Sequence, residues 1–252
     1  MPESKSHIWY ASSMRPYPGN EPWFFDTKSC PPLAEMESHW AQLKDEIAAF
    51  VKEKDSKFVS NKEVYENIDI NNGWSVLVFL FWGLKISNEF KKKCPQTYRY
   101  IKKVPGFVSL SISQLSPHST LAEHTGDTNA MLRCHLGVEI PGRLPDCGLI
   151  VNGDKKNWEE GKWIIFNDAY QHGAWNNTDK RRIVIIMDFI KPEFIGQKNL
   201  ACAFILTRHV SYIYHKVKLI AKMPVFMKTI LFGFILGIIY VLKPVYNLFK
   251  IG

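Results

Sequence analysis

The sequence predicts a mainly β protein with flanking helices, an all-β barrel or sandwich with Greek-key connections, followed by a membrane-associated helical segment. Its 252 residues fit one large domain, or one domain with an appendage, and 46% hydrophobic residues are ample for a core. Short period-two patterns, separated by turn-forming residues, follow one another from about residue 106 to residue 189. A helical pattern precedes these strands, and a strongly apolar, basic segment follows them.

The first part of the chain divides into an irregular arm and a helix. Residues 1–31 are rich in Pro, Gly and aromatic side chains, which predicts an arm without regular structure that packs on a surface. From Pro32 to about Lys54, apolar residues recur at three- and four-residue steps and predict an amphipathic helix that packs on the core. These apolar residues are Leu33, Met36, Trp40, Leu43, Ile47 and Phe50.

The strands are predicted from composition and from alternation. Residues 74–85, WSVLVFLFWGLK, are aromatic and β-branched and predict a buried strand or strand pair. In residues 106–115, apolar side chains alternate with serines, so the serines share one face. In residues 131–140 the same alternation puts Arg133 and His135 on one face of one strand. Further short strands are expected over 147–152, 162–166 and 182–189.

The formal net charge of +8 is concentrated at the C-terminal end. Residues 1–193 carry 24 Lys and Arg against 24 Asp and Glu, whereas residues 194–252 carry eight basic residues and no acidic one. Basic charge alone suits nucleic acid, but here it accompanies a strongly apolar tail. An anionic membrane surface is therefore the expected partner of this segment, and no nucleic-acid partner is expected.

The apolar tail consists of two patterns. Residues 203–222 mix apolar and aromatic residues with His and Lys, as an interfacial helix does. Residues 229–242 form an uninterrupted apolar run that Lys243-Pro244 is expected to close. The run is shorter than the roughly 20 residues of a membrane span, unless it begins at Pro224. A single span, an in-plane or re-entrant anchor, and a hairpin or soluble packing helix therefore remain open.

The chain is expected to work on the cytoplasmic side of a membrane. Lysines are more numerous before the apolar run than after it, so the positive-inside rule keeps the large N-terminal part in the cytoplasm. The first residues lack the apolar region of a secretory signal. The five cysteines are widely spaced and contain no Cys-x-x-Cys pair, which suits a reducing compartment.

Six polar residues point inward from the predicted strands. Taken singly, each has an ordinary explanation, since a histidine near a strand end is usually structural and an arginine on a strand usually pairs with a carboxylate. Taken together, the buried arginines predict an anionic guest, and histidines from different strands predict a metal ion. The six residues are Ser113, His124, Arg133, His135, His172 and Arg182.

Three spaced motifs within residues 74–193 resemble the aspartyl/asparaginyl β-hydroxylase family of iron(II)/2-oxoglutarate-dependent dioxygenases, which includes bacterial lipid acyl-chain hydroxylases. They are NEFKKKCPQT, SQLSPHSTLAEHTGDTNAMLRCHLG and KNWEEGKWIIFNDAYQHGAWNNTDKRRIVIIMDF, in that order. The resemblance implies a double-stranded β-helix, a jelly roll similar to the cupins. It also implies iron(II) as the metal, with 2-oxoglutarate and O2 as cosubstrates.

The same resemblance implies a role for each of the six residues. His124 and His172 would be the iron ligands, and Arg182 would bind the distal carboxylate of 2-oxoglutarate, helped by Ser113. Arg133 and His135 would complete the cosubstrate pocket.

Two acidic residues near the histidines have open roles. The usual third iron ligand is a carboxylate two residues after the first histidine, where this chain has Gly126, as the family does. Asp127 is expected to point off the ligand face and to serve in the surroundings of the metal or in a turn. Asp168 is expected either to accept the second N–H of a metal-bound histidine or to cap a turn.

The substrate is open at the level of the sequence. The basic, apolar C-terminal segment favours an acyl chain of a membrane lipid, and the alternative is an aspartyl or asparaginyl residue of a protein or peptide. Two further readings are a non-catalytic membrane scaffold and a halogenase that binds chloride where the carboxylate is missing. Three regions are expected, namely an arm over 1–31, the dioxygenase domain over 32–195 and a membrane anchor over 196–252.

Overall fold

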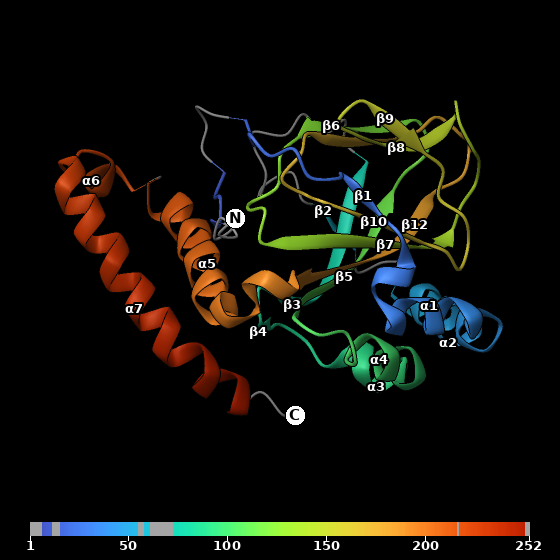
Figure 1. Ribbon diagram of the computed structural model, residues 1–252, viewed down its shortest axis with the longest axis horizontal. Coiled ribbons are helices and arrows are strands. Elements are labelled where there is room, and N and C mark those ends of the chain that lie inside the picture. The colour runs from blue at the N-terminus through green and yellow to red at the C-terminus, as the bar shows by residue number, and fades with distance from the viewer. Residues whose placement is uncertain (1–6, 12–15, 55–57, 61–72, 216, 250–252) are drawn as a thin grey trace, which may run out of the picture.

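Two antiparallel β-sheets face each other and form the body of the protein (Figure 1). The coordinates are a computed structural model, which describes residues 7–11, 16–54, 58–60, 73–215 and 217–249. Of the barrel and the sandwich that the alternating patterns left open, the chain forms the sandwich, which agrees with the jelly roll that the family resemblance implies.

The larger sheet has the order β1-β10-β7-β12-β5-β3-β2, with β4 paired to the edge of β3. Its central strands are long and buried on both faces, because helices cover one face and the second sheet covers the other. Its strands are β1 (Phe24–Phe25), β2 (Val59–Ser60), β3 (Trp74–Phe81), β4 (Leu84–Lys85), β5 (Phe107–Leu115), β7 (Met131–Glu139), β10 (Trp163–Phe166) and β12 (Arg182–Ile190).

The smaller sheet has the order β6-β11-β8-β9 and lies above the larger one in Figure 1. Its strands are β6 (Ser119–His124), β8 (Cys147–Val151), β9 (Asp154–Lys156) and β11 (His172–Asn176). The register of β6 and β11 sets His124 directly opposite His172, although 48 positions separate them in the sequence. Cross-strand neighbours of this kind have side chains close enough to act together.

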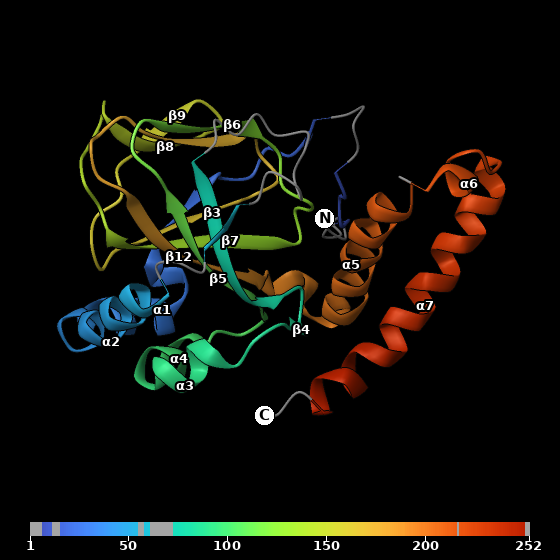
Figure 2. The same ribbon diagram turned by 180° about the vertical axis from the view of Figure 1, so that it is seen from behind.

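Four helices cover the outer face of the larger sheet, and a 3-10 turn leads into them (Figure 2). The 3-10 turn is η1 (Thr27–Ser29), and the four helices are α1 (Pro31–Ser38), α2 (Trp40–Glu53), α3 (Glu89–Lys93) and α4 (Pro95–Ile101). The prediction of one continuous helix to Lys54 was wrong, because the chain breaks at His39. There the Ser38 hydroxyl and the His39 ring both bond the Glu35 carbonyl, which competes with the helical hydrogen-bond pattern.

The C-terminal part of the chain forms a helical hairpin at one end of the sandwich. It contains η4 (Pro192–Gln197), α5 (Lys198–His215), α6 (Lys218–Ala221) and α7 (Val225–Phe249). Helix α7 continues through Pro244, past the Lys243-Pro244 pair that closes the apolar run in the sequence. One turn after Pro244, the Asn247 side chain bonds the backbone of Gly83 and Lys85 at the edge of the larger sheet.

Helix α5 is part of the packed body. Its residues Cys202, Ile205 and Leu206 share one buried cluster with Val108 and Met131 of the larger sheet. The core therefore continues past residue 196, where the sequence suggested the beginning of an anchor. All five cysteines are buried and free.

Candidate active site

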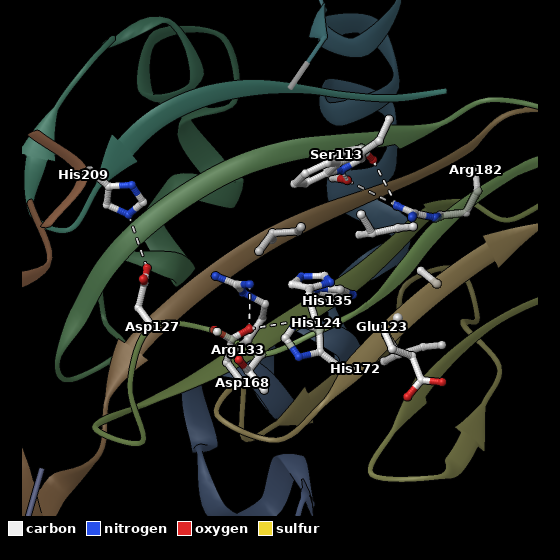
Figure 3. Close-up of a pocket in the computed structure, with 18 of the residues that line it drawn as sticks. Ser113, Glu123, His124, Asp127, Arg133, His135, Asp168, His172, Arg182 and His209 are labelled. Atoms are coloured by element: carbon white, nitrogen blue, oxygen red, sulfur yellow. Dashed lines mark hydrogen bonds and ion pairs between the residues drawn. The ribbon is translucent and has the colours of Figure 1, made fainter. Parts of the chain in front are cut away.

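A cavity of about 490 Å³ lies between the two sheets and opens toward helix α5. Strands of both sheets line it, and all six polar residues singled out in the sequence border it (Figure 3). Its lining also includes Trp74, Glu123, Asp127, Asp168, Arg208, His209 and Tyr212. The tertiary structure thus brings the predicted residues into one site.

His124 and His172 form the centre of the cavity. Their ring centroids are 4.3 Å apart, as the register of β6 and β11 requires. His124 Nδ1 lies 2.9 Å from the Ala122 carbonyl, and His172 Nδ1 lies 2.9 Å from the Tyr170 carbonyl. Because a carbonyl only accepts, each Nδ1 carries a proton, and each Nε2 keeps its lone pair for another partner.

Both imidazoles are kept neutral. Burial, with His172 close by, lowers the pKa of His124 to about 3. Burial, with Arg133 close by, lowers the pKa of His172 to about 4. Neutral imidazole is the form that binds a metal ion, so these two rings suit that role.

Asp168 lies against the histidine pair on a buried turn. Its carboxylate is 3.2 Å from His172 Nε2 and 2.6 Å from an Arg133 guanidinium nitrogen. The expectation that Asp168 accepts the second N–H of a histidine does not hold, since the Tyr170 carbonyl accepts the N–H of His172. Nor does its carboxylate bond the backbone of its turn among the described residues. The carboxylate instead lies against the lone pair of Nε2, an arrangement that a cation bound to both groups would stabilise.

The Asp168 carboxylate explains the glycine at position 126. A Cβ atom added to Gly126 would collide with that carboxylate, and the Gly126 N–H donates to the Asp168 carbonyl at 2.8 Å. The Asp168 carboxylate, which comes from the turn between β10 and β11, therefore already fills the space that the usual third carboxylate would need. Among the described residues, no group of three or more His, Cys, Asp or Glu is arranged to hold a metal ion by itself.

Arg133 lines the cavity, but two carboxylates engage its guanidinium. Besides Asp168, it contacts Asp188, with its Nε 2.9 Å from one carboxylate oxygen. Asp188 lies directly opposite Arg133 in the register of β12 and β7, and the sequence analysis missed it. The acidic residue in the apolar run of β12 was the available signal. Arg133 thus fixes the Asp168 carboxylate beside His172.

Arg182 occupies the deep end of the cavity, close to Ser113 (Figure 3). Its guanidinium stacks at 4.6 Å over the Trp158 ring and donates weakly to Ser113, at 3.3 Å to the carbonyl and 3.5 Å to the hydroxyl. The side chain is 2% exposed, and its Nε has no hydrogen-bond partner among the described residues. Burial lowers the pKa of Arg182 only to about 10, so it stays cationic at neutral pH.

His135 lies beside Arg182 with both ring nitrogens buried and without hydrogen-bond partners in the described part of the chain. Burial and the positive charge of Arg182 lower its pKa well below the usual range. Its ring packs against Trp158 and Phe166. A buried guanidinium and a buried imidazole with unused donors fit a small anion, such as a carboxylate.

The mouth of the cavity is formed by helix α5, a contribution that the sequence analysis did not foresee. Asp127 connects the loop after His124 to this helix, with its carboxylate 3.3 Å from the His209 ring and 3.8 Å from the Arg208 guanidinium. Asp127 therefore points away from the histidine pair, as expected (Figure 3). The polar residues within the interfacial pattern of 203–222 were the signal that this helix faces something other than lipid on one side.

The chain is similar in sequence to proteins that are named as hydroxylases. A family model described as aspartyl/asparaginyl beta-hydroxylase matches residues 37–192. The ornithine lipid ester-linked acyl 2-hydroxylase of Rhizobium tropici is 34% identical over 69% of this chain and 62% of its own. The human aspartyl/asparaginyl beta-hydroxylase is 30% identical over 66% of this chain and 22% of its own.

The chain spans less than two thirds of the length of either curated relative. Among solved structures, a prolyl-4-hydroxylase from Pseudomonas putida overlaps 63% of this chain and 98% of its own, at 14% identity and a TM-score of 0.38. At that score the overlap adds nothing to the fold described above.

Proposed function

The chain belongs to the aspartyl/asparaginyl β-hydroxylase family, and on that premise we propose that it is an iron(II)/2-oxoglutarate-dependent dioxygenase that hydroxylates an unactivated C–H bond. The observation that carries this proposal is the cavity between the sheets. There a pair of neutral histidines lies beside a buried cationic pocket, in which Arg182 Nε and both His135 ring nitrogens lack partners among the described residues.

Each end of the cavity suits one of the two groups. His124 and His172 would hold iron(II) through their Nε2 atoms, with Asp168 beside the ion. Arg182 and Ser113 would bind the distal carboxylate of 2-oxoglutarate. When bound, these groups supply the oxidising chemistry that inserts oxygen from O2 into a C–H bond.

The chain itself would orient and protect the reactants. The carbonyls of Ala122 and Tyr170 hold the two imidazole rings in one tautomer and one direction. Arg133, fixed by Asp188, holds the Asp168 carboxylate beside the histidines. The Trp158 ring covers the Arg182 guanidinium, and the smaller sheet keeps water from this end of the cavity.

The substrate we propose is an acyl chain of a membrane lipid. The cavity opens at helix α5, and the other side of α5 packs against α7, the long apolar helix. An acyl chain drawn from a membrane would therefore meet the mouth of the cavity directly. The relative from Rhizobium tropici is named for hydroxylation of a lipid acyl chain, which supports the same class of substrate.

A second candidate substrate is an aspartyl or asparaginyl residue, for which the human relative is named. The feature that favours it is the basic pair Arg208 and His209 at the mouth, which suits a carboxylate side chain. We rank it second because Asp127 already engages both residues.

We also propose that the protein is held at a membrane with its catalytic part on the cytoplasmic side. The described residues include one helix that is long and apolar enough to cross a membrane, Val225–Phe249. The division into an arm, a dioxygenase domain and an anchor belongs to the same proposal. It is refined by α5, which connects the second and third regions.

The test is turnover by the purified chain with iron(II), 2-oxoglutarate and either lipid vesicles or aspartyl peptides. We expect succinate release to rise with lipid, and the lipid acyl chain to gain 16 daltons by mass spectrometry. Gain of that mass on the peptide alone would establish the second candidate. If the chain hydroxylated neither the lipid nor the peptide, that result would contradict a hydroxylase of either class.

Two histidine variants complete this test. His172→Ala should abolish iron binding and lower turnover by more than the roughly 10–100-fold that loss of an outer-shell partner costs. The matched control is His118→Ala, because His118 is an exposed histidine that pairs with Asp179 outside the cavity. If His172→Ala retained iron and turnover, the metal assignment would be wrong.

A further inference from the structure

One side of helix α7 is apolar and exposed along its whole length. Its outward residues include Phe226, Ile230, Phe234, Val241 and Leu248, which are between 64% and 67% exposed. Acidic residues do not occur in α7, and its two lysines, at positions 228 and 243, are not among its exposed positions. An apolar surface of this extent requires a partner, because soluble surfaces rarely expose it.

The other side of α7 is bound to the catalytic body at two separate places. Near its beginning, Phe232 packs against Phe204 of α5, with ring centroids 5.3 Å apart. Near its end, the Asn247 side chain donates to the Gly83 carbonyl at 2.6 Å and accepts from the Lys85 N–H at 3.0 Å. The Lys85 ammonium also donates to the Asn247 carbonyl at 2.9 Å.

These two attachments argue against a helix that crosses the bilayer. At 1.5 Å per residue, α7 is about 37 Å long, close to the roughly 30 Å thickness of the hydrocarbon layer. If α7 crossed that layer along its axis, α5 and β4, which lie beside it, would have to enter the layer too (Figures 1 and 2). That would take Lys85 and the surface around it out of water, which is costly for a charged group.

We propose that α7 lies flat in the interface of an anionic membrane leaflet, with its outward face among the acyl chains. This inference rests on the membrane association proposed above and assigns its geometry. An in-plane helix keeps both attachments intact and buries only the apolar side. The net positive charge of residues 194–252, which contain no acidic residue, matches the negative charge of such a leaflet.

The same orientation would bring the active site to the lipid. Helix α5 lies between α7 and the sandwich, and it contributes Arg208, His209 and Tyr212 to the cavity lining. When α7 lies at the boundary between headgroups and acyl chains, the mouth of the cavity, beside α5, lies next to the leaflet. A lipid chain would then reach the histidine pair without passing through bulk water.

The first experiment measures binding of the full chain to vesicles of neutral lipid with and without anionic phosphatidylglycerol. We expect stronger binding to the anionic vesicles, and a loss of at least about tenfold in Phe234→Asp. Phe234→Leu is the matched control, because it keeps the apolar face and should bind as the wild type does. Equal binding by Phe234→Asp would contradict docking through this face.

The second experiment separates an in-plane helix from a crossing one. Single cysteines are introduced as Phe226→Cys, Ile238→Cys and Leu248→Cys and labelled with a fluorophore, while the five native cysteines are buried. Quenching by brominated lipids gives the depth of each label. Three equal, shallow depths support the proposal, whereas a deep central label between two shallow ones would show a crossing helix.

The outcomes also distinguish failure of docking from failure of the proposed function. Succinate release by detergent-solubilised Phe234→Asp should equal that of the wild type, since Phe234 lies outside the cavity. A chain that turns over in detergent but binds neither kind of vesicle would remove the docking proposal alone. A chain that binds vesicles in plane but never turns over would leave the docking and remove the hydroxylase.

Discussion

The cavity between the sheets buries polar groups that lack partners among the described residues, whereas helix α7 exposes apolar side chains to solvent. Each region reverses the usual burial pattern, but in the opposite sense. In the cavity, Arg182 and His135 are buried with unused donors, and folding gains nothing from them until an anion binds. On α7, residues such as Phe234 gain nothing until an apolar medium covers them.

The comparison teaches that the two regions are specified for different partners. Small, charged groups suit the cavity, because its donors are few, fixed and shielded from water. A broad, fluid surface suits α7, because its apolar face is continuous and carries no acidic side chain. The vesicle experiments above test the α7 side of this contrast, and four changes test the cavity side, from the largest expected effect to the smallest.

The largest effect is expected for Arg182→Met. The change should raise the KM for 2-oxoglutarate by roughly 10–100-fold, since a hydrogen-bonded charge pair contributes about 1.5–3 kcal/mol. The free protein should melt no lower than the wild type, because an unpaired buried charge is removed. Titration of 2-oxoglutarate and a thermal melt check both expectations. A melt lowered with an unchanged KM would mean that Arg182 is structural.

The next effect concerns Gly126→Asp. A side chain at this position collides with Asp168, so we expect a loss of about 1–3 kcal/mol in the free energy of unfolding, and weaker iron binding. The double variant Gly126→Asp with Asp168→Gly moves the carboxylate and removes the collision with the Asp168 side chain, but the Asp168 carbonyl still lies 2.8 Å from the new Cβ. Iron affinity should recover in it, and stability should recover in part. Failure to recover would show that position 126 is small for another reason.

A smaller effect is expected with pH. Burial holds the folded pKa values of His124 and His172 at about 3 and about 4, and that of His135 well below its usual range. An unfolded histidine has a pKa of about 6.5, so between about pH 4 and pH 6.5 the unfolded chain binds more protons. The metal-free protein should therefore lose stability as pH falls through this window.

Denaturant unfolding at several pH values measures that slope. Each histidine contributes at most about 1.4 kcal/mol per pH unit. Buried Asp168 and Asp188, whose pKa values are raised by burial, oppose the effect at the acid end. His135→Leu isolates one histidine and should flatten the slope. An unchanged slope would contradict a neutral, buried His135.

The smallest effect is expected for Asp127→Ala. This residue joins the loop after His124 to α5 through partly exposed ion pairs, which contribute about 0.2–1 kcal/mol. Iron binding should be unchanged, whereas His124→Ala should lose it. Iron titration of both variants checks this. Loss of iron from Asp127→Ala would place that carboxylate in the metal site, against the geometry.

The sequence by itself indicated the sheet sandwich, the family and six of the residues that line the cavity. Alternation along a strand fixes which side chains share a face, so Arg133 and His135 were placed together without a structure. The motifs around His124 and His172 carried the family. The roles of these residues remain proposals that the variants above test.

Only the tertiary structure decided which groups meet across the fold. It showed that Asp168 fills the space beside Gly126, that Asp188 engages Arg133, and that α7 continues through Pro244. It also brought α5 to the mouth of the cavity. The physical reason is that periodicity reports a residue's own strand or helix, whereas partners from distant segments depend on how those elements pack.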